Sequence, residues 1–173
     1  DRLAVSFTYA KLNSIANPDA NSPLPYYRGK GLLEQAVTDS GLSYAILRPT
    51  VIFGPEDILI NNIAWLLRTF PLFVIAGSGD YKIQPIFVED VAELAVKEAE
   101  REENIALDAV GPETFTFNEL VKLIAKHVKS RARIVHLPPR LALLLSRVVG
   151  YVVRDVVLTQ EEVEGLVANL LVS

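Results

Sequence analysis

The sequence contains no cysteine and no methionine among its 173 residues, and it has only two histidines. Without cysteine, disulfides, thiolate metal sites and cysteine nucleophiles are excluded. His127 and His136 alone are too few for a histidine-rich metal site, so we expect no bound metal. His127 is expected to face solvent from a helix, and His136 is expected to be structural.

Long apolar runs and an excess of positive charge are also missing. The most apolar stretch, 141–158, is interrupted by Arg147, Arg154 and Asp155, so we expect an amphipathic surface helix rather than a membrane span. The net charge of −4 argues against binding to nucleic acid or an anionic membrane. Because the start lacks the layout of a secretory signal, we expect a cytoplasmic protein. Asp rather than Met at position 1 suggests part of a longer chain.

What the sequence does contain is a high share of apolar residues. Half of the residues are hydrophobic, and the mean hydropathy is +0.28. Such a chain buries a core and is not disordered. The composition also predicts exposed apolar faces, which favour a protein partner or a homo-oligomer.

Apolar periodicity and turn signals predict alternating helices and strands. Helices are expected over 26–40, 58–70 and 141–149. Three further helices begin with the capping-box pattern, at Asp90 with Glu93, Thr116 with Glu119, and Thr159 with Glu162. Short apolar runs of strand length lie at 43–47, 73–76, 83–87, 105–110 and 133–137. This alternation favours an α/β fold with a parallel sheet.

The helix expected over 26–40 holds the strongest chemical signal. Its apolar face is predicted to contain Leu32, Leu33, Ala36 and Val37. Tyr26 and Lys30 are four residues apart, so their side chains share one face of the helix. A cation beside a phenol favours the phenolate, which makes Tyr26 a candidate proton donor or acceptor. An ordinary surface tyrosine and lysine is the alternative.

The order of the motifs resembles the short-chain dehydrogenase/reductase superfamily in its extended or atypical branch. Within that branch, the sequence is similar to NAD(P)-dependent epimerases and to proteins related to the 39 kDa subunit of respiratory complex I. The resemblance rests on five stretches: NSIANP at 13–18, SPLPYYRGK at 22–30, AILRPTVIFG at 45–54, INNIAWLLR at 60–68 and QPIFVEDVA at 84–92.

This resemblance implies a role for each matching residue. Ser14 is expected to hydrogen-bond the substrate, Tyr26 to transfer a proton, and Lys30 to hold the nicotinamide ribose and favour the phenolate. The cofactor-binding residues implied are Tyr26, Lys30, Pro49, Thr50 and Val51. The substrate-cleft residues implied are Asn61, Asn62 and Gln84.

The glycine-rich turn that binds a dinucleotide in this superfamily is missing. Gly77-Ser78-Gly79 follows an apolar run, but Lys82 stands where the third glycine is needed, so a tight turn is predicted. We therefore expect the C-terminal portion of a Rossmann-like NAD(P)-binding fold with a small α/β substrate-side region. The expected parts are 1–55 and 56–173, interleaved in space.

Three functions are compatible with these patterns. The first is an NAD(P)-dependent oxidoreductase or sugar-nucleotide-epimerase-like protein, with NAD or NADP and a small-molecule substrate in the intact parent. This chain alone is expected to be inactive and to bind the dinucleotide weakly or not at all. The second is a non-catalytic NADP(H)-binding scaffold, and the third is a half-domain that binds a partner through apolar faces. Trp65 is expected in the core or in a cleft wall.

Overall fold

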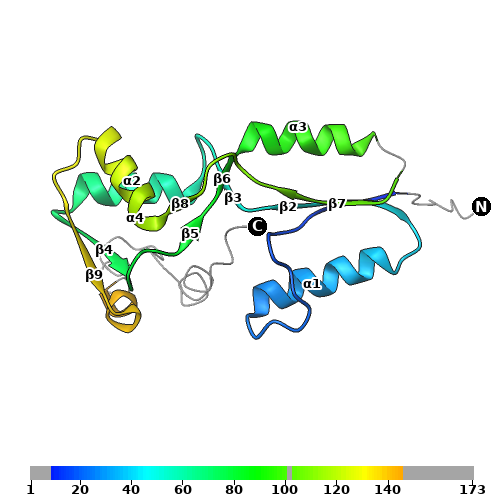
Figure 1. The fold of residues 1–173 in the computed structure, drawn as a ribbon, viewed down its shortest axis with the longest axis horizontal. Helices are drawn as coiled ribbons and strands as arrows, with labels where there is room; N and C mark the ends of the chain where they lie inside the picture. Colours follow the sequence, from blue (N-terminus) through cyan, green and yellow to red (C-terminus); the bar gives the residue numbers. More distant parts are fainter. Residues whose placement is uncertain (1–8, 101–102, 146–173) are drawn as a thin grey trace, which may run out of the picture.

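The computed structural model describes residues 9–100 and 103–145. The molecule is elongated, with a sheet flanked by α1 and α3 at one end and a lobe containing α2 and α4 at the other (Figure 1). No helix among the described residues is both long and apolar enough to cross a bilayer. Of the predicted surface helix at 141–158, only residues up to 145 are described, and residues 139–145 are helical.

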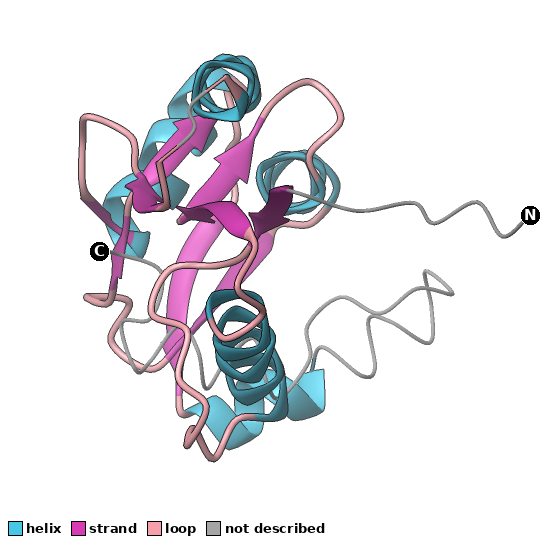
Figure 2. Cartoon of the chain, turned by 90° about the vertical axis from the view of Figure 1, so that its right-hand side faces the viewer, coloured by secondary structure: helices cyan, strands magenta, loops and turns pink. Residues whose placement is uncertain are grey.

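The first end is built on a parallel sheet with the strand order β1-β2-β7. Its strands are β1 (Tyr9–Asn13), β2 (Ser43–Pro49) and β7 (Ile105–Ala109). Helix α1 (Pro25–Thr38) and helix α3 (Val88–Ala99) contact β2 from opposite sides, and Figures 1 and 2 show helices on both sides of the strands. Covering both faces suits the three consecutive buried apolar residues of β2, 45–47.

The other end contains α2 (Ile58–Thr69), α4 (Phe117–His127) and short paired strands. The two strand-like runs on either side of the Gly77 turn do not pair with each other; each pairs with a segment distant in sequence. The pairs are β3 (Val51–Phe53) with β6 (Pro85–Phe87), β4 (Leu72–Ala76) with β9 (Arg133–Leu137), and β5 (Lys82–Ile83) with β8 (Phe115–Thr116), the last antiparallel.

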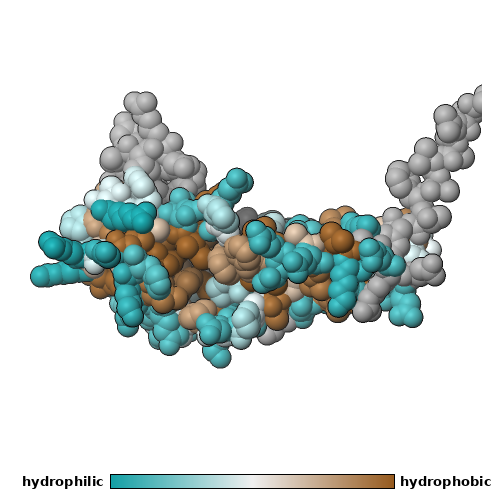
Figure 3. All heavy atoms as spheres, turned by 90° about the horizontal axis from the view of Figure 1, so that it is seen from above, coloured by the Kyte–Doolittle hydropathy of each residue, from teal (hydrophilic) through white to brown (hydrophobic). Residues whose placement is uncertain are grey.

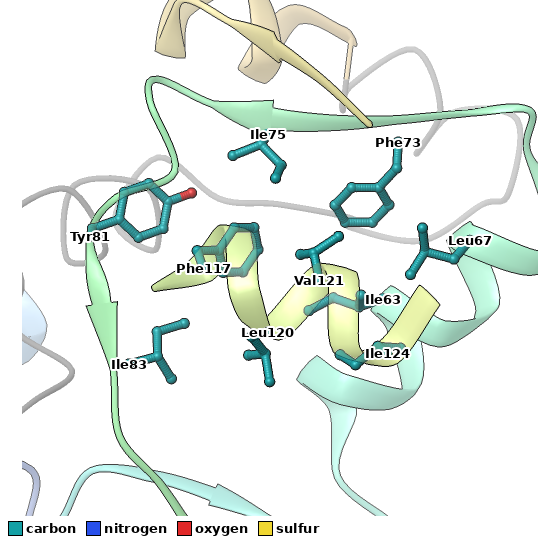
Figure 4. Packing of buried hydrophobic residues seen from close by; sticks show 10 residues of the cluster. All are labelled: Ile63, Leu67, Phe73, Ile75, Tyr81, Ile83, Phe117, Leu120, Val121 and Ile124. Carbon is teal, nitrogen blue, oxygen red and sulfur yellow. The ribbon is translucent and has the colours of Figure 1, made fainter. Parts of the chain in front are cut away.

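The largest apolar core lies in this second lobe, between α2, α4 and β4 (Figure 4). Burial of Tyr81 raises its pKa to about 12, so its phenol stays neutral. The buried members of this core are Ile63, Leu67, Phe73, Ile75, Tyr81, Ile83, Phe117, Leu120, Val121 and Ile124.

The helix starts follow the predicted capping patterns only in part. Thr116 and Glu119 form the predicted capping box at α4. The box predicted at Asp90 is wrong, because α3 begins at Val88 and its N-cap is Phe87, which places Asp90 inside the first turn. An acid there still interacts favourably with the helix dipole. The box at Thr159 lies outside the described residues.

The buried face of α1 differs from the predicted one. Leu32 and Leu33 are exposed, whereas the helix buries Tyr27, Gly31 and Glu34. Glu34 is only 6% exposed, and its carboxylate accepts two hydrogen bonds of 3.1 Å from Arg48 Nε and one of 2.7 Å from Arg48 Nη2. These hydrogen bonds raise the pKa of Arg48 above its ordinary value. A paired charge, rather than an apolar stripe, joins α1 to β2.

Both histidines lie in the second lobe. His127 is exposed, as predicted, and its Nδ1 lies 2.9 Å from the Leu123 carbonyl oxygen. His136 in β9 is also exposed, with Nε2 2.8 Å from Asn118 Oδ1. Asn118 in turn donates through Nδ2 to the Ser78 carbonyl. His136 therefore contributes to a structural hydrogen-bond network.

We expect Ile75→Ala to reduce the free energy of unfolding by about 3 kcal/mol, because it opens a cavity at a fully buried position. Chemical denaturation measures the loss. Val96→Ala, on the exposed side of α3, is the control and should change the value by no more than about 0.5 kcal/mol. A loss below about 1 kcal/mol for Ile75→Ala would contradict the packing described for this core.

The capping box should make stability depend on pH. Hydrogen bonds from the Thr116 backbone N–H and hydroxyl lower the pKa of Glu119 below its ordinary 4.5. Because the folded pKa is the lower one, this stabilisation is present above about pH 4.5 and is lost as pH falls through the folded pKa. The difference in unfolding free energy between the wild type and Glu119→Gln should therefore shrink in acid. Thr116→Ala alone should lower the unfolding free energy by about 1 kcal/mol. In that variant, the effect of Glu119→Gln on the unfolding free energy should depend less on pH.

Candidate functional site

Ser14 lies just beyond the carboxyl end of β1. Its backbone N–H donates to the Leu47 carbonyl at 2.7 Å, and Ala16 N–H donates to the Pro49 carbonyl at 2.9 Å, so the chain stays beside β2 here. Ser14 is 4% exposed, and its Oγ has no hydrogen-bond partner within the described residues. A buried hydroxyl without a partner is unfavourable, so this atom is available to a polar atom of a ligand.

Tyr26 and Lys30 lie in the first two turns of α1. Pro25 occupies the first helical position, where its missing N–H is tolerated. Lys30 Nζ donates to the carbonyl oxygen of Asn13, the residue before Ser14, at 3.3 Å. The same ammonium lies 5.9 Å from the centre of the Tyr26 ring. The structure therefore places Lys30 between Tyr26 and the end of β1.

The two adjacent tyrosines of α1 have different environments. Tyr26 is 51% exposed, whereas Tyr27 is buried and contacts Tyr26 edge to face with ring centres 5.7 Å apart. Burial, followed by the neighbouring Tyr26, raises the pKa of Tyr27 above its ordinary value. Tyr27 is thus a neutral core residue, and Tyr26 is the phenol open to solvent.

The turn after Ser14 fixes the start of α1. Asp19 N–H donates to the Tyr27 carbonyl at 3.4 Å, and Gly31 lies directly against the same turn. A Cβ on Gly31 would lie 2.2 Å from the Ala20 nitrogen, so a larger residue would push the helix away. Close approach of backbone to helix is a reason for glycine at this position.

Of the predicted cofactor-loop residues, Pro49 ends β2, Val51 begins β3, and Thr50 lies between them. Thr50 N–H donates to the Ala109 carbonyl, and its hydroxyl donates to the Gln84 carbonyl. The Gln84 side chain donates to the Gly111 carbonyl at 2.8 Å. The structure thus brings Thr50 and Gln84 together, but their side-chain donors already have partners inside the protein.

Asn61 and Asn62 lie on the exposed side of α2. Asn61 Nδ2 donates to the carbonyls of Pro55 and Asp57, at 2.9 and 2.7 Å, so it stabilises the start of its own helix. Within residues 9–100 and 103–145, Asn61 forms no hydrogen bond to Ser14, Tyr26 or Lys30. The hydrogen bonds of Asn61 are thus local to α2 and do not connect it to the proposed catalytic residues.

The sequence patterns missed Glu34 and Arg48 as residues that hold this site. Arg48 lies in an otherwise apolar strand, and a charged residue in such a strand requires a partner. Glu34 follows Lys30 by four residues, which places it on the same side of the helix. These two signals indicate that Arg48 needs an acidic partner and make Glu34 one candidate. The described residues contain no group of three or more metal-ligating side chains.

Comparison with known sequences gives distant relatives. No protein-family model matches the chain. It is 25% identical over 172 residues to NADH dehydrogenase (ubiquinone) 1 alpha subcomplex subunit 9, mitochondrial, of Arabidopsis thaliana, which covers 92% of the chain and 42% of that protein. It is also 25% identical over 152 residues to the mitochondrial NADH-ubiquinone oxidoreductase 40 kDa subunit of Neurospora crassa, with 86% and 39% covered. The chain thus spans about two fifths of these relatives.

Solved structures give the fold. The UDP-glucuronic acid 4-epimerase of Bacillus cereus, in complex with NAD, matches with a TM-score of 0.65 at 15% identity, over 79% of the chain and 52% of the epimerase. The UDP-glucose 4-epimerase of Thermotoga maritima, with UDP-glucose, matches with a TM-score of 0.62 at 22% identity, over 77% and 51%. These matches confirm the predicted α/β, Rossmann-like fold, and the partial coverage fits a chain that corresponds to one part of such proteins. The chain is thus similar in sequence to the complex I 39 kDa-type subunits and in fold to nucleotide-sugar epimerases, as the resemblance to extended and atypical short-chain dehydrogenase/reductase proteins predicted.

Proposed function

We propose that the chain carries the nicotinamide- and substrate-facing residues of an NAD(P)-dependent oxidoreductase or sugar-nucleotide-epimerase-like protein. The observation that supports this most strongly is the buried Ser14 hydroxyl, which has no partner within the described residues. It lies at the carboxyl end of a parallel strand, where open α/β sheets bind their ligands. The adjacent Asn13 carbonyl accepts from Lys30, which also neighbours Tyr26.

The three side chains suit the reduction of a carbonyl group. Negative charge develops on the carbonyl oxygen as hydride adds to its carbon. Ser14 would donate a hydrogen bond to that oxygen, and Tyr26 would donate the proton. The Lys30 ammonium would favour the phenolate that remains. A bound nicotinamide would supply the hydride and, in the reverse direction, accept it.

The residues present fit one end of a nicotinamide dinucleotide. The hydroxyl of Tyr26 and the ammonium of Lys30 are suited to the ribose beside the nicotinamide, and Ser14 supplies a buried polar atom that no described residue bonds. Pro49, Thr50 and Val51 would border the nicotinamide, through backbone and apolar surface rather than through the Thr50 hydroxyl, which is already bonded. NAD and NADP are both compatible with these contacts.

The Gly77 turn does not provide a binding site for the pyrophosphate of the dinucleotide. Gly77 and Gly79 have φ values of 69° and 73°, as the predicted tight turn requires. A Cβ on Gly79 would lie 2.5 Å from Asn118 Oδ1, and a strand rather than a helix follows the turn. The turn therefore lies against α4 and cannot surround a phosphate.

A non-catalytic scaffold is the second candidate. It is supported by relatives that are named as subunits of NADH-ubiquinone oxidoreductase and align with 86–92% of the chain. A subunit of that kind would bind protein partners. These relatives are named as mitochondrial, so the cytoplasmic location and the oxidoreductase activity both stay predictions.

We also propose that the chain has two interleaved parts, 1–55 and 56–173. The first would contain Ser14, Tyr26 and Lys30, and the second would form the substrate side. The return of β7 to pair with β2 supports the interleaving, because a late strand completes the sheet that the early strands began.

Substituting Tyr26 tests the catalytic proposal. In the protein that carries this chain, with NAD and UDP-glucose as probes, Tyr26→Phe should lower turnover about 10²–10⁴-fold because the proton donor is lost. Tyr27→Phe is the matched control and should stay within about threefold, since Tyr27 is a buried core residue. Dinucleotide binding without turnover of any nucleotide sugar by the wild type would instead support the scaffold.

A binding measurement on the 173-residue chain tests the proposal that its residues fit only the nicotinamide end of the dinucleotide. We expect weak or absent binding of NADH and NADPH, because the sequence lacks the glycine-rich turn that binds the pyrophosphate in this superfamily. Isothermal calorimetry and nicotinamide fluorescence measure it. Any residual binding should be lost in Lys30→Met, whose side chain keeps the length and removes the charge. A micromolar dissociation constant for the wild-type chain would refute this expectation.

A further inference from the structure

One end of the second lobe forms a continuous surface from two segments distant in sequence. We call it the basic tip and define it as residues 65–72 and 126–133. The Ser130 hydroxyl donates to the Leu67 carbonyl, and Arg133 N–H donates to the Pro71 carbonyl at 2.9 Å. These bonds hold the last turn of α2 against the connection between α4 and β9. The surface is on the far side of the lobe from the sheet that carries Ser14 (Figure 1).

The basic tip concentrates positive charge in an acidic chain. Neither of its segments contains Asp or Glu, although the whole chain has a net charge of −4. Its cations are all exposed, and none forms an ion pair with another described residue. In Figure 3, hydrophilic side chains project from this end of the molecule, the left-hand end in Figure 1. The cations are Arg68, Lys126, Lys129, Arg131 and Arg133.

Apolar side chains are exposed among these cations. Trp65 is 44% exposed and contacts Phe70 edge to face, with ring centres 5.8 Å apart. Of its two predicted places, the core and a cleft wall, the core is therefore wrong. Leu72, which pairs with Arg133 across β4 and β9, is 53% exposed. Tryptophan and arginine side by side are typical of the residues that dominate protein–protein binding energy.

Lys129 has a backbone conformation that is uncommon for residues other than glycine. It follows α4 with φ of +53°, in the left-handed region, and the bonds Ser130 N–H to Ala125 O and Lys129 N–H to Lys126 O form a Schellman motif. Glycine is the usual residue at this position, because a Cβ is disfavoured there. A lysine at this position, against the local preference, supports a use of its side chain outside the fold.

We propose that the basic tip binds an acidic surface of a partner protein, with Trp65 and Leu72 covered by an apolar side chain of that partner. The charges of the tip are complementary to such a surface and have no partners among the described residues. An extended polyanion is disfavoured, because the rest of the chain is acidic, including exposed Glu89, Asp90 and Glu93 on α3. This proposal does not depend on the function of Ser14, Tyr26 and Lys30.

A synthetic peptide of glutamate and leucine serves as the acidic probe, with phosphatidylserine vesicles and single-stranded DNA as competing surfaces. We expect the peptide to bind the wild-type chain, more weakly as salt rises. Arg131→Gln/Arg133→Gln should weaken binding about tenfold at low salt. Lys11→Gln/Lys97→Gln removes the same net charge elsewhere and should change affinity less than about twofold.

Lys129→Gly separates binding from folding. Glycine relieves the left-handed strain, so the midpoint of thermal unfolding should stay the same or rise while peptide binding weakens. Equal losses in the two double variants, or no peptide binding by the wild type, would overturn the proposal. Tighter binding to vesicles or DNA than to the peptide would overturn it in favour of a lipid or nucleic-acid surface.

Discussion

The ion pair between the buried Glu34 and the partly exposed Arg48 determines where α1 lies on the sheet. Taking a carboxylate out of water is unfavourable unless its hydrogen bonds are replaced, and Arg48 replaces them from two nitrogens at once. Tyr26 and Lys30 precede Glu34 by eight and four residues, so all three lie on one side of the helix. Anchoring Glu34 on β2 therefore also sets the distance from Lys30 to the end of β1. Gly31, between Lys30 and Glu34, allows the helix to lie directly against the turn at Asp19 and Ala20.

Features that depend on neighbours in sequence were predictable. The helix predicted over 26–40 occupies 25–38, the strand at 133–137 has its predicted bounds, and the capping box at Thr116 forms as expected. The partners of the short strands were not predictable, because β4 pairs with β9 across more than fifty residues and both are short apolar runs. Apolar periodicity also chose the wrong face of α1, since a paired charge can occupy a buried position that the pattern assigns to leucine. At Asp90, one extra turn at the start of α3 removed the predicted cap.

The candidate site also combines features that sequence neighbours predict with features that depend on tertiary contacts. Lys30 beside Tyr26 follows from helix geometry alone, and in the structure Lys30 also bonds the residue before Ser14. Thr50 and Gln84 lie together only because β3 and β6 pair. The Thr50 hydroxyl donates to the Gln84 carbonyl, and the Gln84 side chain donates to the Gly111 carbonyl. Asn61 is a local helix stabiliser, a role that its sequence position does not distinguish from ligand binding. Residue type and spacing thus predict a side chain's neighbours on its own element, whereas its free hydrogen-bonding capacity depends on the tertiary contacts.

Charge is distributed unevenly along the molecule. The cations of the basic tip lie at one end, and acidic residues of α3 lie over the sheet at the other, so a total of −4 hides two surfaces of opposite sign (Figure 1). At physiological salt, charges interact over about 8 Å, so a partner responds to the local surface and not to the total. The proposed ligand position beside Ser14 and the proposed interface at the basic tip would also use different forces. The first depends on a buried hydroxyl and one lysine, the second on exposed cations around an aromatic ring. Because α2 and α4 form the tip without taking part in the β1-β2-β7 sheet, either surface can be altered while the other keeps its structure.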